Sequence, residues 1–268
     1  MKGIRIADRF ITSFTYIFLY APLLIMILFS FNSSQSTSVF KGFSLKWYGE
    51  MFSRSDTVNA LKNTLLLAVT SAVIATVLGT VAAVGIFNMK NKPLKSTIMT
   101  VTNIPMLNPD IVTGVSLMLL FVFIGRLLGA RDSLNFFTIL IAHVTFNLPY
   151  VILNILPKLR QTDRRLFEAA QDLGAPPVKA FFKVVLPAIR PGIISGMMMA
   201  FTLSLDDFVI SYYTNGTGFQ TLPLMIYAMT RKKVKPDMYA LSSVIFLTVL
   251  LLLVLSNLIQ TKSNKKNK

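Results

Sequence analysis

Three acidic residues, Asp110, Asp206 and Asp207, fall inside otherwise apolar stretches of the chain. An ionised aspartate at the centre of a bilayer costs about 2.5 to 3.5 kcal/mol on insertion scales, so such residues need a reason to be there. On a helix, neighbouring residues point about 100° apart, so Asp206 and Asp207 would not face one pathway equally. Asp207 would share its face with Ser204, Ser211 and Thr214, which could line a water-filled route. We expect the pair either to contact a translocated solute or to support packing between subunits.

Asp110 follows Pro109 near the middle of a predicted span. Because proline lacks an N–H and its ring clashes with the preceding turn, we expect the helix to bend or break there. The Asp110 carboxylate would then cap the second half-helix or bond a neighbouring helix, with substrate contact as an equal alternative. The single histidine, His143, is expected to be a hydrogen-bonded intramembrane residue rather than a metal ligand or a base.

The sequence offers little for catalysis. It has no cysteine, which excludes disulfides and Cys-based metal sites, and it has one imidazole. Ser195-Gly196 is the only nearby dipeptide that suggests a serine nucleophile, and it lacks a G-x-S-G motif. An intramembrane hydrolase is therefore disfavoured. No phosphate-cradling G-x-x-x-x-G-K-[ST] loop occurs. We therefore expect a chain that is not an enzyme, with no catalytic residue, no metal site and no cofactor of its own.

The composition indicates the elements that must position these residues. The chain is 53% hydrophobic and only 14% charged, and its 27 Lys and Arg against 11 Asp and Glu lie in short clusters between long apolar runs. This pattern is typical of a multi-pass membrane protein. Because a spanning helix needs about 20 apolar residues, we predict an all-α, polytopic transmembrane helical bundle. Its six spans are 10–31, 61–87, 97–124, 135–156, 190–213 and 238–260.

The basic residues also predict an orientation. With the N-terminus in the cytoplasm, most of the 27 basic residues lie on the cytoplasmic side, so both termini are expected there in a cytoplasmic membrane. The exception is the group Arg231, Lys232, Lys233 and Lys235. The first apolar stretch is longer than a typical signal-peptide core and has no small-x-small cleavage pattern, so we interpret it as a retained anchor.

We expect three parts along the chain: an anchor and extracytoplasmic segment (1–60), a transmembrane domain (61–260) and a basic cytoplasmic tail (261–268). The longest polar interruption is the cytoplasmic loop 157–189. There Asp163 can cap a short helix, which Gly174 would end. A second amphipathic run would extend from Val178 and end at Pro187. An ordinary surface hairpin of two helices is as consistent with this pattern as a binding element.

One motif in this loop favours the second alternative. Glu168-Ala169-Ala170, three residues, Gly174, nine residues and Val184-Val185-Leu186-Pro187 resemble the EAA signature of binding-protein-dependent ABC importer permeases. Only Val184 departs, where the family usually has isoleucine. The resemblance implies the type I permease fold and makes Glu168, Ala169, Ala170 and Gly174 the element that docks on an ATPase. It also implies separate partners: an ATPase dimer that binds ATP and Mg, a second homologous permease and an extracytoplasmic substrate-binding protein.

Further segments are similar to the second ("C") permease subunit of spermidine/putrescine import systems. They are Phe31 to Ser34, Lys46 to Tyr48, Pro109 to Val112, Ser204 to Asp207 and Leu222 to Tyr227. This resemblance implies a polyamine substrate, and a path for a flexible polycation needs spaced carboxylates and aromatic faces. We therefore predict five path residues: Asp110, Asp206, Asp207, Tyr212 and Tyr213. Another small solute, or an ion-coupled carrier or channel, is the alternative.

Overall fold

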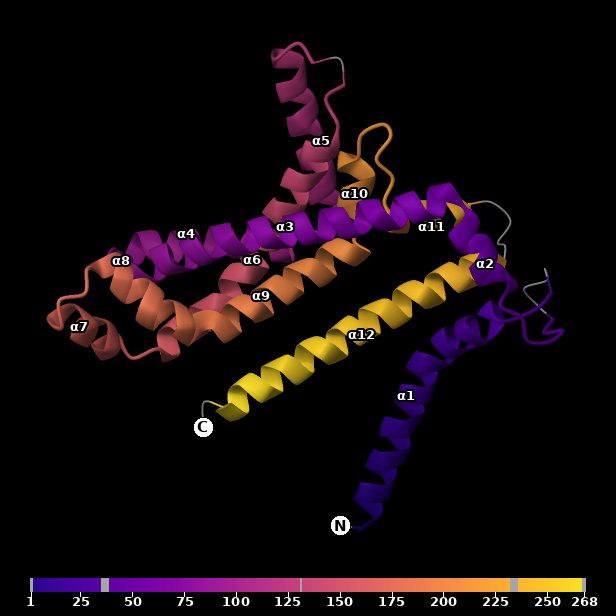
Figure 1. Cartoon of the computed structure of the whole chain (residues 1–268), viewed down its shortest axis with the longest axis horizontal. Helices are drawn as coiled ribbons and strands as arrows, with labels where there is room; N and C mark the ends of the chain where they lie inside the picture. The colour runs from indigo at the N-terminus through magenta and orange to yellow at the C-terminus, as the bar shows by residue number, and fades with distance from the viewer. Residues whose placement is uncertain (1, 35–38, 131, 232–235, 267–268) are drawn as a thin grey trace. The chain divides into compact units, whose positions relative to one another are not determined.

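A computed structural model describes residues 2–34, 39–130, 132–231 and 236–266, apart from the side chains of residues 2–8, 164, 236, 252, 253 and 255–266 (Figure 1). Within these residues the fold is helical, with one isolated β-bridge between Asn32 and Phe43. The elements are α1 (Lys2–Ser30), α2 (Lys46–Ser53), α3 (Ser55–Asn88), α4 (Lys92–Leu107), α5 (Asp110–Leu127), α6 (Phe136–Gln161), α7 (Arg164–Asp172), α8 (Pro177–Ala180), the π-helix η1 (Phe181–Val185), α9 (Leu186–Asp206), α10 (Val209–Thr214), α11 (Leu222–Thr230) and α12 (Pro236–Lys266).

In the described part of the chain, five helical segments are long and apolar enough to cross a membrane. They are Arg9–Ser30, Ser55–Asn88, Asp110–Leu127, Phe136–Gln161 and Pro177–Asp206, and a shorter apolar stretch covers Asp237–Leu251. The all-α prediction is confirmed, but two predicted spans are not single helices. The span 97–124 is divided at Asn108 and Pro109 into α4 and α5, and the span 190–213 is interrupted after Asp206.

The chain forms two compact units. The first comprises residues 1–59 and 225–252. Its centre is the turn after α1, where the buried Asn32 side chain accepts the N–H of Lys41 at 2.9 Å and donates to the carbonyl of Val39 at 2.8 Å. The Trp47 indole donates to the Asn32 carbonyl at 2.5 Å. Arg54, before α3, forms an ion pair with Asp237 at the start of α12.

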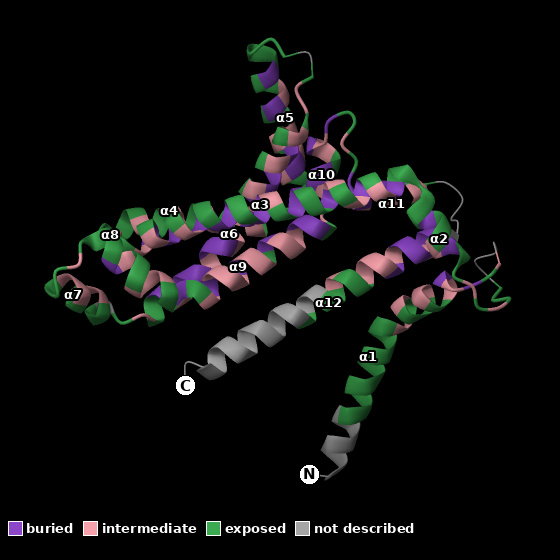
Figure 2. Ribbon diagram, in the orientation of Figure 1, coloured by how far each residue is buried: buried purple, intermediate pink, exposed green. Residues whose placement is uncertain are grey.

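The second unit comprises residues 60–224 and 253–268. Its core is built on α6, which packs between α3 and α9. Small residues permit the close approach: a Cβ at Gly79 of α3 would lie 2.6 Å from Val151 Cγ1, and one at Gly196 of α9 would lie 3.2 Å from Val151 Cα. Figure 2 shows that the buried residues gather where these helices meet.

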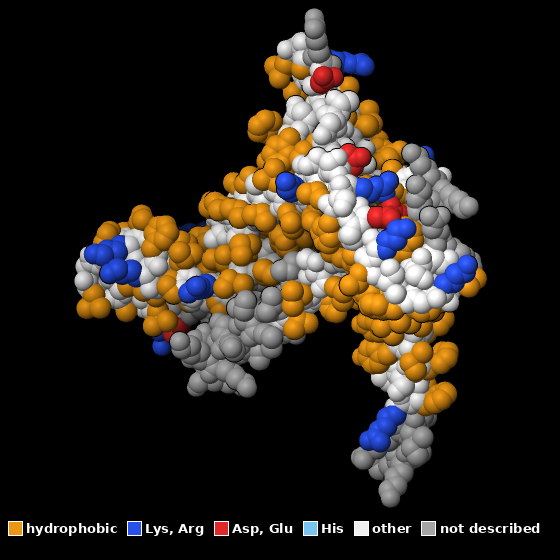
Figure 3. Space-filling view, turned by 45° about the vertical axis from the view of Figure 1, so that its right-hand side comes forward, with side chains coloured by type: hydrophobic (Ala, Val, Ile, Leu, Met, Phe, Trp, Pro, Cys, Tyr) orange, Lys and Arg blue, Asp and Glu red, His pale blue; other side chains and the backbone are white. Residues whose placement is uncertain are grey.

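Much of the remaining surface is apolar. Helix α1 is exposed over most of its described side chains, including Phe10, Phe14 and Phe18. Figure 3 shows hydrophobic side chains over much of the visible face, with Lys and Arg in separate groups. Large exposed apolar areas are expected where a helix faces lipid or another subunit. The predicted tail 261–268 lies outside the described side chains.

Candidate functional site

Helix α7 lies in the loop that carries the Glu168 motif. The Asp163 carboxylate accepts the N–H of Arg165 at 3.0 Å, which confirms the predicted cap. At the other end Gly174 has a φ of +85°, as predicted for a glycine stop. Gly174 donates to the Gln171 carbonyl at 2.8 Å and Ala175 to the Ala170 carbonyl at 3.0 Å. This pair of bonds is a Schellman motif, which ends α7 sharply.

Three apolar side chains in and after α7 are exposed. Leu166 is 55% exposed, Leu173 is 89% exposed and Val178 is 69% exposed. Glu168 and Ala169 are also exposed, and Ala170 is half-buried. An apolar group left open on a polar loop is typical of a surface that binds another protein.

A cavity of about 540 Å³ lies beside α7. Its wall includes Glu168 and Phe167 of α7, Phe87 at the end of α3 and Phe181 of η1. Carboxylate and aromatic groups together can receive a basic or apolar side chain. The loop therefore offers both a protruding helix and a hollow next to its glutamate.

The second helical run differs from its prediction. It does not end at Pro187 but continues from Pro177 through η1 into α9. The N–H of Leu186 donates to the carbonyl of Phe181, an i to i−5 bond that belongs to a wider π turn. Since that turn is widened, the ring of Pro187 fits at the start of α9 without breaking the helix.

The two adjacent aspartates occupy different environments. Helix α9 ends at Asp206, and Asp207 has an extended backbone with φ −61° and ψ 125°. Asp206 is exposed, whereas the side chain of Asp207 is only 8% exposed. The helical spacing assumed from the sequence therefore does not apply to this pair.

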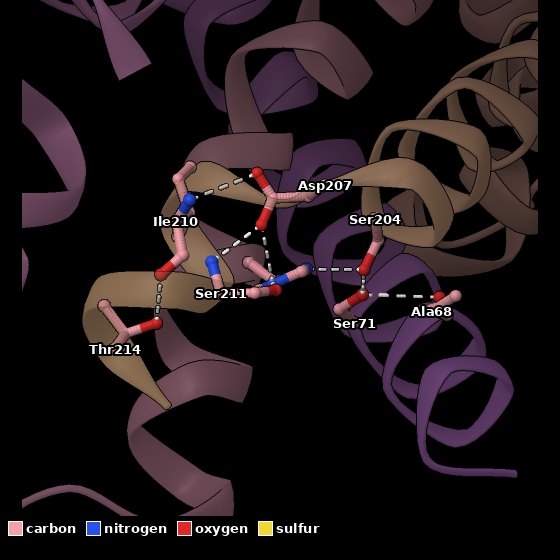
Figure 4. Close-up of polar contacts among 8 residues, drawn as sticks. Ala68, Ser71, Ser204, Asp207, Ile210, Ser211 and Thr214 are labelled. Carbon is pink, nitrogen blue, oxygen red and sulfur yellow. Dashed lines mark hydrogen bonds and ion pairs between the residues drawn. The ribbon is translucent and has the colours of Figure 1, made fainter. Parts of the chain in front are cut away.

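Asp207 turns towards a buried group of side chains, which we call the His143 cluster (Figure 4). Its members come from α3, α6, α9, the break and α10, and they are Ser71, His143, Ser204, Asp207 and Ser211. The Asp207 carboxylate accepts the N–H of Ser211 at 2.7 Å and that of Ile210 at 3.3 Å. A carboxylate that accepts the first N–H groups of α10 stabilises the start of that helix.

His143 lies at the centre of the cluster and is 2% exposed. Its Nδ1 is 2.6 Å from Ser204 Oγ, and its Nε2 is 3.0 Å from Ser211 Oγ. Nε2 also lies 3.5 Å from Asp207 Oδ2. The prediction of a hydrogen-bonded histidine is confirmed. The sequence indicated Ser204 and Ser211 only as a stripe on the same face as Asp207, and it did not indicate Ser71.

The other path residues lie on α5 and α10. The break at Pro109 is confirmed, and Asp110 is the exposed first residue of α5. The predicted side-chain cap by Asp110 is not among the described hydrogen bonds of α5, whose N-cap residue is Pro109. A Cβ at Gly114, one turn after Asp110, would lie 3.0 Å from Tyr213 Cδ2, so Tyr213 packs on α5 near Asp110.

Tyr212 is 48% exposed, and its ring stands perpendicular to that of Tyr213 with centroids 5.3 Å apart. The structure thus brings Asp110 and Tyr213 to one region of α5 and α10, and it places Asp207 in the interior. Among the described residues no group of three or more His, Cys, Asp or Glu could hold a metal ion.

Comparison with known proteins gives a family match over residues 75–268, to the model of the binding-protein-dependent transport system inner membrane component. The putrescine transport system permease protein PotI of Escherichia coli (strain K12) is 41% identical over 230 residues, 86% of this chain and 82% of that protein. The spermidine/putrescine transport system permease protein PotC of Haemophilus influenzae is 37% identical, covering 93% and 94%. PotC of Escherichia coli (strain K12) is 35% identical, covering 100% and 98%.

Solved structures with the same fold are more distant in sequence. A chain of a bacterial alginate ABC transporter, in complex with its alginate pentasaccharide-bound periplasmic protein, matches with a TM-score of 0.76 at 15% identity, covering 98% of this chain and 96% of that one. A chain of the MetNI methionine ABC transporter, in an inward-facing conformation, matches with a TM-score of 0.64 at 17% identity, covering 76% and 94%. At these identities the similarity is one of fold.

Proposed function

The chain belongs to the family of binding-protein-dependent transport system inner membrane components, and we propose that it is the polyamine-translocating permease subunit of an ATP-binding-cassette importer. The substrate assignment depends on the similarity to spermidine/putrescine permeases along the whole chain. One such relative is 35% identical, and the match covers 100% of this chain and 98% of the relative. The chain is a transporter subunit and not an enzyme. ATP and Mg are expected to bind to separate ATPase subunits.

Helix α7 is the proposed ATPase-docking element. Three features support this role: the exposed Leu166 and Leu173, the sharp end at Gly174 and the cavity beside Glu168. The small Ala169 and Ala170 let a partner surface approach the helix closely. Docking would bury the apolar group and bring partner side chains to Glu168, so movement of the ATPase would be transmitted through α7 to α6 and α9.

The proposed substrate path runs along the region of the α9–α10 break and the start of α5. Asp206 and Asp110 offer exposed carboxylates, and Tyr212 offers a half-exposed aromatic face. Carboxylates and aromatic rings can replace the water around an ammonium group. Tyr213 supports this surface from behind through α5, and Asp207 shapes the path from the interior of the break. Affinity for the free solute is assigned to the separate binding protein, because a path must also release its cargo.

The proposed assembly has this chain paired with a second homologous permease, two ATPase subunits and an extracytoplasmic binding protein. The chain is a multi-pass membrane protein, and we place it in the cytoplasmic membrane with both termini in the cytoplasm. The basic loop around α7 supports this orientation, because the ATPase must meet it on the cytoplasmic side.

Uptake by the reconstituted complex tests the proposal. Proteoliposomes that contain both permeases and the ATPase, with binding protein outside and ATP inside, should accumulate labelled putrescine or spermidine. Replacement of the Walker A lysine of the ATPase should abolish uptake, while ionophores that collapse ion gradients should not. Uptake that persists without ATP hydrolysis and stops with the ionophore would instead indicate an ion-coupled carrier. ATP-dependent uptake of another solute alone would overturn the polyamine assignment.

A further inference from the structure

The two ring nitrogens of His143 face opposite sides of the break between α9 and α10. Nδ1 lies 2.6 Å from Ser204 Oγ, in the last turn of α9. Nε2 lies 3.0 Å from Ser211 Oγ on α10 and 3.5 Å from Asp207 Oδ2. One side chain of α6 thus connects the end of one helix to the start of the next.

The backbone is irregular at the break between α9 and α10. Asp207 leaves the helical conformation, and its two carboxylate oxygens accept N–H groups from the first turn of α10. A polar neighbour on the inner side further offsets the cost of burying this carboxylate. His143 is that neighbour, and it is held in turn through Ser204, whose Oγ lies 2.8 Å from Ser71 Oγ of α3.

We propose that His143 is a positioning residue that keeps Asp207 turned inward, so that Asp206 alone of the pair is presented to a cationic substrate. The geometry of this proposal is independent of the substrate, whereas its consequence for transport rests on the proposed polyamine function. His143 does not contact the substrate; it acts through the shape of the break. Asp207 therefore shapes the path, whereas Asp206 faces it.

Cysteine accessibility tests the geometry without any transport assay. The chain contains no cysteine, so Asp206→Cys and Asp207→Cys each introduce a single thiol into the assembled complex. A water-soluble charged methanethiosulfonate should label the first at least about tenfold faster than the second, because buried thiols react slowly. In a His143→Asn background the labelling rate at position 206 should fall or that at 207 should rise by a similar factor. Equal rates at both positions, unchanged in that background, would overturn the proposal.

Two replacements separate positioning from simple packing. The amide of glutamine reaches about as far as Nε2, whereas that of asparagine ends near Nδ1. His143→Gln should keep a polar group beside Asp207 and retain the KM of uptake, while His143→Asn should raise this KM about tenfold, as expected for loss of one polar contact to a carboxylate. Equal KM values for both variants, at equal membrane abundance, would contradict the role at Asp207.

A double-mutant cycle links His143 to Asp206. If His143 acts on transport through the presentation of Asp206, adding His143→Asn to an Asp206→Asn variant should raise KM no further. Multiplicative effects would show that the residues act independently and would overturn the proposal. Should the wild-type complex transport no polyamine, the proposed function fails, while the labelling result still decides the geometry.

Discussion

Ser204 Oγ lies 2.6 Å from Nδ1 of His143, although 61 residues separate the two in the chain. The same hydroxyl lies 2.8 Å from Ser71 Oγ, so α3, α6 and α9 meet at one buried polar point. A serine hydroxyl can donate one hydrogen bond and accept others, and it can therefore serve both neighbours. Removal of this hydroxyl should affect three helices at once.

Ser204→Ala is expected to lower stability by about 1 to 3 kcal/mol, because it leaves buried polar groups on His143 and Ser71 without this partner. Thermal unfolding of the purified complex in detergent measures the change. The matched control is Thr202→Val, because the Thr202 hydroxyl bonds only the Met198 carbonyl of its own helix at 2.9 Å among the described contacts. An equal loss in both variants would contradict a special role for Ser204.

Gly174→Ala should weaken the end of α7 by about 1 kcal/mol, because its φ of +85° is unfavourable for a side chain. The effect is conformational, since a Cβ there would have no atom within 4 Å. We expect reduced ATPase binding and reduced uptake at normal abundance. Gly85→Ala in α3 also has open space but a helical backbone, so it should be neutral or slightly stabilising.

Glu168→Lys reverses the charge beside the cavity next to α7 and should uncouple the permease from its ATPase. A misplaced charge at an interface costs several kcal/mol, so co-purification of the ATPase and uptake should both fall at least about tenfold. Glu50→Lys is the control, because Glu50 is also an exposed carboxylate and belongs to α2, outside the loop 157–189. Normal co-purification and uptake with Glu168→Lys would refute docking through this residue.

Gly216→Ala is expected to disturb the connection after α10. A Cβ there would collide with the Leu134 carbonyl and lie 2.7 Å from Asn135 Cα, and backbone atoms cannot move aside as a side chain can. Overpacking of this kind costs about 1 to 3 kcal/mol, so membrane abundance and thermal stability should fall together. Gly218→Ala tests backbone strain as the alternative cause. A Cβ at Gly218 would have no atom within 4 Å, but the φ of +89° is unfavourable for alanine, so this variant should lose only the free energy of that strain. Equal effects would exclude close packing as the reason for Gly216.

The helices and the loop motif follow from local chemistry and could be predicted. Apolar runs define membrane helices, the Asp163 cap and the Gly174 stop define α7, and Pro109 stands at the break between α4 and α5. The break at Asp207 has no such local signal, because neither proline nor glycine stands there. It depends on a histidine and a serine from helices distant in sequence, which no periodicity indicates.

The sequence by itself determined a multi-pass helical permease with a capped loop helix, α7, because hydropathy, charge distribution and the Glu168 to Gly174 spacing are properties of neighbouring residues. It also placed two carboxylates in the same short segment. Only the tertiary structure decided that Asp207 turns to His143 and Asp206 faces outward, since a buried carboxylate is stable only where other helices bring polar groups within hydrogen-bonding distance.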